Sequence, residues 1–89
     1  VLNCDWMELD NLDVTPYKSL LELNCGYNNL TELDVSQNID LVVLHCDGNE
    51  LGELDISHNS FIEELWCGSN NLENLDVTHQ PQLKIFSCS

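Results

Sequence analysis

The chain has 89 residues, and its 16 acidic side chains face only two lysines, Lys18 and Lys84, for a formal charge of −14. That length supports one small domain, and that charge argues against nucleic acid and anionic membrane surfaces, which attract Lys and Arg. The acidity fits a solvated exterior, a cationic partner or a bound cation. Apolar residues are interspersed, with no run long enough to span a bilayer and no basic-then-apolar leader at the start, so we expect any targeting signal to lie elsewhere.

A 21-residue repeat organises the whole sequence, and repeat positions are counted here from Leu20 as position one. In chain order, a segment of the form L-x-C occupies residues 2–4, 23–25, 44–46 and 65–67, with F-x-C at 86–88. A second segment, L-D-V or L-D-I, occupies residues 12–14, 33–35, 54–56 and 75–77. Their alternation has period two, which predicts short extended segments joined by turns. No register gives a helical stripe. Because the apolar positions recur in phase at a fixed period, we predict a mostly β stacked solenoid without substantial helix.

The two ends of the chain depart from the repeat. Met7 stands where later coils have asparagine, and residues 15–19 (TPYKS) and 78–82 (THQPQ) differ from the central turns. No polar capping helix or hairpin is evident, so we expect one solenoid over residues 1–89, with about four coils plus a final strand and no clear caps. Exposed strand edges are templates for pairing. They predict either caps belonging to a longer solenoid or head-to-tail stacking into a filament.

The motif LxxLxCxxNxLTxLDVSxN resembles the leucine-rich repeat, L-x-x-L-x-[LC]-x-x-N-x-L. It looks most like the 21-residue bacterial repeats of the internalin family, especially those bearing a cysteine, and is similar to surface-protein repeats of Bacteroidetes-type bacteria. The resemblance covers essentially the whole chain. It implies a parallel sheet on the concave side, extended segments and turns on the convex side, and an extracellular or cell-surface location.

The five cysteines are spaced 21 residues apart, at Cys4, Cys25, Cys46, Cys67 and Cys88. Each is two residues beyond an inward apolar side chain, so it also points inward, and rungs about 4.8 Å apart give a ladder of buried thiols. Disulfides are the rival interpretation, but an odd count cannot pair completely and in-register parallel side chains offer poor geometry. Short C-x-x-C spacings for a metal are absent, and no base shares a face with a thiol.

The recurring asparagines and aspartates have structural interpretations. The resemblance implies that Asn28, Asn49 and Asn70 bond backbone groups in the turn leaving each strand. At position fifteen, we expect Asp13, Asp34, Asp55 and Asp76 to accept local N–H or hydroxyl bonds from the Ser or Thr two residues on. The alternative is a column of carboxylates that binds Ca²⁺ on the convex side.

The resemblance also implies that positions three, five and seven project from the concave face. Against a polar background, we predict a ligand-binding group there, with two aromatic residues at its rim; its members are Val43, His45, Glu64 and Trp66, with Tyr27 and Trp6 at position eight. Exposed aromatics are common interface anchors. The alternative is that the tryptophan only covers neighbouring strand surface. His58 and His79 are too few for a metal site and are expected to be surface residues.

No nucleophile–base pair, carboxylate dyad or phosphate-binding glycine loop occurs, so we predict neither an enzyme nor a cofactor or metal site. The leading hypothesis is a non-catalytic module of a secreted or surface bacterial protein that binds a protein or glycan through its concave face. The alternative is a structural subunit that stacks head-to-tail into an extracellular filament.

Overall fold

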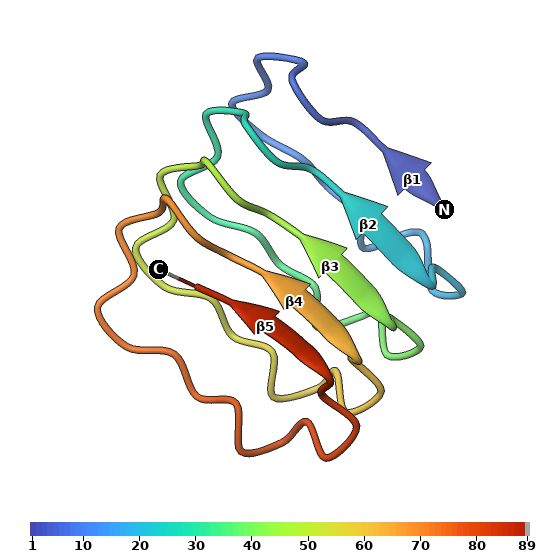
Figure 1. Cartoon of the computed structure of the whole chain (residues 1–89). Helices are drawn as coiled ribbons and strands as arrows, with labels where there is room; N and C mark the ends of the chain where they lie inside the picture. Colours follow the sequence, from blue (N-terminus) through green and yellow to red (C-terminus); the bar gives the residue numbers. More distant parts are fainter. Residues whose placement is uncertain (89) are drawn as a thin grey trace.

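The computed structural model describes residues 1–88, which form one parallel sheet backed by turns and extended segments (Figure 1). The sheet order follows the chain, with strands β1 (Leu2–Asn3), β2 (Glu22–Asn24), β3 (Val43–His45), β4 (Glu64–Trp66) and β5 (Ile85–Ser87). The described residues contain no helix, and therefore none long and apolar enough to cross a membrane. The prediction of a mostly β solenoid is confirmed.

Neighbouring strands pair in a register shifted by one whole repeat. Leu23 pairs with Leu2 on one side and Leu44 on the other, and Leu44 pairs in turn with Leu65. Because side chains alternate across a strand, these leucines enter the core while their neighbours in the strand face outward. The central leucine of β2, β3 and β4 is fully buried. The 21-residue period of the sequence therefore sets the register in which neighbouring strands pair.

The core lies between the sheet and the opposite, convex side of each coil. Its fully buried members come from the strands, from position eleven between the two extended segments, and from the second extended segment; they include Leu23, Leu44, Leu65, Leu30, Leu51, Val14, Val35 and Ile56. The terminal coils close it less completely, because Leu2, Leu9 and Leu12 at one end and Leu72, Leu75, Val77 and Leu83 at the other stay half-buried. Phe86 in β5 is 49% exposed. Burial is thus greatest in the two middle coils.

A column of asparagines joins each coil to the one before it. The Asn49 amide nitrogen lies 3.0 Å from the Cys25 carbonyl, 3.1 Å from that of Cys46 and 3.3 Å from that of Asp47. Its side-chain oxygen accepts the Leu30 N–H at 3.1 Å. Asn28 and Asn70 make the equivalent bonds in their coils. Each side chain therefore satisfies backbone groups that the turn leaving a strand would otherwise bury unpaired.

A second row of buried amides lies at position nineteen, in Asn38, Asn59 and Gln80. The Asn59 amide donates to the carbonyls of Val35 and Asn38, both at 2.9 Å, so it too bridges two coils. Sequence reasoning passed over this row, although the recurring amide at one repeat position was a usable signal. The three side-chain oxygens are buried with no partner among the described residues.

Replacing Asn49 with alanine should lower the free energy of unfolding by about 3 kcal/mol, because several buried backbone groups lose their partner at once. Asn29→Ala is the matched control, since Asn29 is exposed in the same kind of turn. It should cost less than about 0.5 kcal/mol. Urea denaturation followed by far-UV circular dichroism measures both. Equal costs for the two variants would contradict a structural role for the column.

Candidate binding site on the strand face

Four of the predicted ligand-binding residues lie together on the face of β3 and β4 that points away from the core, here called the strand face. Val43 pairs with Glu64, and His45 pairs with Trp66, across the two strands. The His45 and Trp66 rings meet edge to face with centroids 5.8 Å apart. The two residues that sequence reasoning singled out are therefore in direct contact.

Glu64 organises this group. Its Oε1 accepts the indole N–H of Trp66 at 2.7 Å and a bond from His45 Nε2 at 3.1 Å. The hydrogen bond from Trp66, and then that from His45, holds the pKa of Glu64 below its ordinary value. The carboxylate is thus anionic at neutral pH, and it holds both rings in place. Sequence reasoning placed Glu64 in the group without identifying this role.

The same arrangement recurs two coils earlier, where β2 carries Glu22 and Asn24. The Asn24 amide donates to Glu22 Oε2 at 2.8 Å. In the second and fourth coils (the even coils), a carboxylate at position three therefore accepts a bond from the side chain two residues on. The first and third coils (the odd coils) carry Val1 and Val43 at that position. This pair was missed, and the signal that could have found it was the two-coil alternation of the strand positions.

Position seven alternates aspartate with glycine for a related reason. Asp5 Oδ1 accepts the Gly26 N–H at 2.6 Å, and Asp47 Oδ1 accepts the Gly68 N–H at 2.7 Å. Each odd coil supplies a carboxylate and each following even coil supplies an amide without a side chain in the way. A β-carbon on Gly26 would lie 3.4 Å from Asp5 Oδ1 and 3.2 Å from the Asp47 carbonyl. The alternation therefore gives each of these two carboxylates a backbone donor in the next coil.

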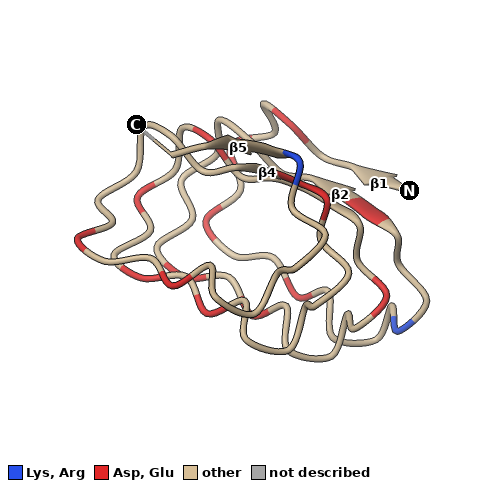
Figure 2. Cartoon of the chain, turned by 60° about the horizontal axis from the view of Figure 1, so that its bottom comes forward, with Lys and Arg blue, Asp and Glu red and all other residues tan. Residues whose placement is uncertain are grey.

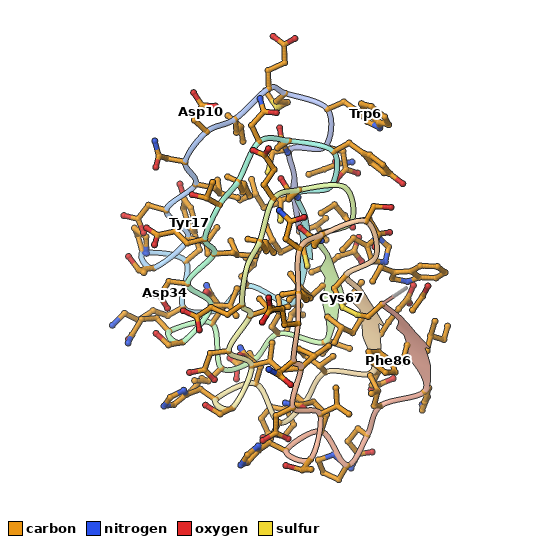
Figure 3. The ribbon with its side chains drawn as sticks, turned by 90° about the vertical axis from the view of Figure 1, so that its left-hand side faces the viewer. Trp6, Asp10, Tyr17, Asp34, Cys67 and Phe86 are labelled. Atoms are coloured by element: carbon orange, nitrogen blue, oxygen red, sulfur yellow. A yellow bond between two sulfur atoms is a disulfide. The ribbon has the colours of Figure 1, made fainter. Side chains whose placement is uncertain are left out.

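Trp6 and Tyr27 form a separate pair at the rim, in the turns that leave β1 and β2. Their rings stack with centroids 4.3 Å apart and planes 6° from parallel. Figure 3 shows Trp6 on the side of the molecule that carries the strands, opposite Asp34. The six residues predicted as one group therefore divide into the strand-face group and this rim pair.

Position eight has left-handed backbone in each of the first four coils, at Trp6 (φ 59°), Tyr27 (φ 55°), Gly48 (φ 67°) and Ser69 (φ 54°). Gly48 also makes room for the rim pair, since a β-carbon there would lie 2.3 Å from the Tyr27 ring. Bulky residues adopt this conformation at a cost of about 1–2 kcal/mol each. The aromatic stack offsets part of that cost.

The cysteine ladder is buried along most of its length. Burial, helped by repulsion from Asp47, raises the pKa of Cys46 to about 12. Burial raises the pKa of Cys25 as well, with further contributions from Cys46, Cys4 and Asp5, and it raises that of Cys4 ahead of repulsion from Asp5. A thiol that stays protonated is a poor nucleophile and a poor metal ligand. These three side chains act as small apolar groups.

The prediction that all five cysteines are free thiols is wrong for the last two, because Cys67 and Cys88 form a disulfide. Their Cα atoms are 4.6 Å apart, which lies within the range that a disulfide spans. An odd number of cysteines forbids complete pairing, and it does not forbid a single bridge. The free thiols among the described residues are Cys4, Cys25 and Cys46.

On the convex side, Asp13, Asp34, Asp55 and Asp76 each accept the backbone N–H of the residue two positions on. Three of them, all except Asp55, also accept that residue's hydroxyl at 2.6 Å. These bonds lower the pKa of all four carboxyls, that of Asp55 included. Within residues 1–88, no group of three or more His, Cys, Asp or Glu side chains is placed to hold a metal ion. The geometry thus adds nothing in favour of the calcium alternative.

The in-register parallel sheet, the asparagine column and the buried cysteines define a leucine-rich-repeat solenoid. Among solved structures, the chain is similar to the functional domain of InlJ from Listeria monocytogenes, which includes a cysteine ladder, with 52% sequence identity and a TM-score of 0.90. The match covers 92% of this chain and 18% of the InlJ chain. No protein-family model matches the chain, and no curated protein matches its sequence. The chain is thus similar to the internalin-like leucine-rich repeats, and the resemblance expected from the sequence is confirmed.

The disulfide predicts that three thiols per chain react with Ellman's reagent in denaturant without reductant, and five after reduction. In the folded protein, Cys25 and Cys46 should react orders of magnitude more slowly than a free thiol, because they are buried and protonated. Absorbance at 412 nm counts the thiols, and intact mass checks the count. Five reactive thiols without reduction would show that Cys67 and Cys88 are unbonded in solution.

Proposed function

We propose that this chain is a non-catalytic protein-binding module of a secreted or surface bacterial protein, and that the strand face is its recognition surface. The support from the fold is that leucine-rich repeats of the internalin-like type are typically protein-binding modules. The observation that supports the strand face as the recognition surface is the Trp66–His45 pair. The other outward side chains of the strands are aliphatic, small and polar, or charged.

Trp66 has the properties of an interface anchor. Its ring is large and apolar, and its N–H is already paired with Glu64, so binding a partner would cost it little conformational freedom. His45 packs against it, and Val43 adds apolar surface one residue pair away. Anchors of this kind supply most of the affinity of protein interfaces. A glycan could stack on the same ring, so it belongs in the test.

The immobilised chain is first screened against extracellular proteins and a glycan array. Each ligand found is then used to test a variant of the strand face. Trp66→Ala should weaken the binding of the ligand by at least about 30-fold, which corresponds to roughly 2 kcal/mol. Phe61→Ala is the control, because Phe61 is an exposed aromatic outside the strands. Circular dichroism should show both variants folded. Unchanged binding by Trp66→Ala for every ligand found would exclude the strand face as the site.

The second candidate is a structural subunit that stacks its end coils head-to-tail into a filament. What favours it is the half-exposed apolar cross-section, with Leu2 and Leu9 at one end and Phe86 at the other. Heterologous contacts of this type propagate when they do not close.

Light scattering and negative-stain imaging of the purified chain test this candidate. Rods of coil-like width should form as the concentration rises, and Phe86→Glu should abolish them while Phe61→Glu leaves them intact. A chain that remains strictly monomeric at every concentration would contradict the filament and leave the binding module as the proposed function.

A further inference from the structure

The charge of the strand face indicates which chemistry its partner carries. Lys18 lies in the turn before β2 and Lys84 directly precedes β5, both at the edge of the molecule where the chain enters the sheet (Figure 2). Lys84 is paired there with Glu63 at 3.2 Å. The described strands themselves carry Glu22 and Glu64 and no lysine or arginine. An aromatic surface whose strands carry carboxylates and neither lysine nor arginine is complementary to a cationic ligand.

Glu64 has hydrogen-bonding capacity left for such a ligand. Its Oε1 is occupied by Trp66 and His45, whereas its Oε2 has no hydrogen-bond partner among the described residues. The carboxylate side chain is 30% exposed and the adjoining imidazole 36% exposed, so both are accessible. A guanidinium can donate to a carboxylate and stack on an aromatic face at once, which a compact ammonium does less well. The Glu64–Trp66 pair therefore favours arginine.

The spacing of the carboxylates indicates the shape of the partner. Glu22 and Glu64 each pair with Val43, from opposite sides, so they stand two rungs apart, about 10 Å. An extended polyproline II segment places residues i and i+3 on the same side about 9 Å apart. A segment running across the strands can thus set one cationic side chain at each carboxylate, with the residues between them over Val43. The order Glu22, Val43, Glu64 across the three strands is therefore complementary to a segment with a cationic side chain at every third residue.

We propose that the strand face binds an extended, arginine-bearing segment of a partner protein. One guanidinium donates to Glu64 Oε2 and stacks on the face of the Trp66 ring, and a second cationic side chain three residues away meets Glu22. This inference rests on the proposed function, and it adds the chemical class and the conformation of the partner.

The probe is a synthetic (Arg-Pro-Pro)₄ peptide, with (Lys-Pro-Pro)₄ and (Gln-Pro-Pro)₄ as matched peptides. The protein carries Trp6→Phe so that its remaining tryptophan, Trp66, reports binding by fluorescence. The arginine peptide should bind at least tenfold more tightly than the glutamine peptide, with the lysine peptide between them, and binding should weaken as salt rises. Equal binding of the arginine and glutamine peptides would overturn the proposal.

Glu64→Gln tests the contact itself, because it removes the charge and keeps an oxygen that can accept from Trp66 and His45. It should weaken binding of the arginine peptide about tenfold, Glu22→Gln about threefold, and the control Glu53→Gln, an exposed convex-side residue, not at all. An unchanged affinity in Glu64→Gln would overturn the proposal. A chitosan oligomer that competes as well as the peptide at equal charge would overturn the assignment to a protein segment.

The two proposals fail in different ways. If the arginine peptide does not bind while Trp66→Ala still abolishes binding of another ligand, the partner chemistry inferred here is wrong and the proposed function stands. If no ligand of any class depends on Trp66, the proposed function fails together with this inference.

Discussion

The structure depends on one requirement, which is that the backbone groups in the turn leaving each strand must find partners inside the molecule. Asn28, Asn49 and Asn70 meet it by reaching from their own coil to the coil before, and each approaches carbonyls in both coils. A side chain that spans two coils tolerates no change in their offset. The constant 21-residue period, the register of the strands and the confined space that a cysteine fills all follow from it. The position-nineteen amides repeat the device on the convex side.

The charge of −14 is compatible with this compact stack because most of the repeated carboxylates have local donors. On the convex side the donor is a backbone N–H two residues on, as for Asp34 and Ser36. On the strand face it comes from Asn24, Trp66 or the glycine of the next coil. Like charges one rung apart repel, and on the strand face the two-coil alternation places glycine or valine between them. Hydrogen bonding and charge on the strand face therefore impose the same two-coil order.

The fold could be predicted from the sequence because a period and an inward apolar pattern are visible in every coil. The site could be predicted only in part. His45 and Trp66 were found adjacent because equal repeat positions must face each other, whereas Glu64 accepting from both depends on side-chain conformations that no spacing encodes. The bridge between Cys67 and Cys88 was missed because five equally spaced cysteines are equivalent in sequence. The left-handed backbone at position eight was not predicted, because such a conformation is usually inferred from glycine and this position holds Trp6 and Tyr27 in the first two coils.

The size of the strand face decides how it can bind. The strand face extends only about 20 Å across its five strands, and each strand is two or three residues long. Its area is therefore smaller than the roughly 800 Å² per partner that a standard interface buries. Affinity must then come from a few side chains that are already ordered, and Glu64 orders Trp66 before any partner arrives. Because the position-three carboxylates Glu22 and Glu64 stand two coils apart, an extended partner with the same repeat gains one ionic contact for each pair of coils without new geometry. A linear ligand in register with the coils therefore uses this scaffold more fully than a globular one of equal contact area.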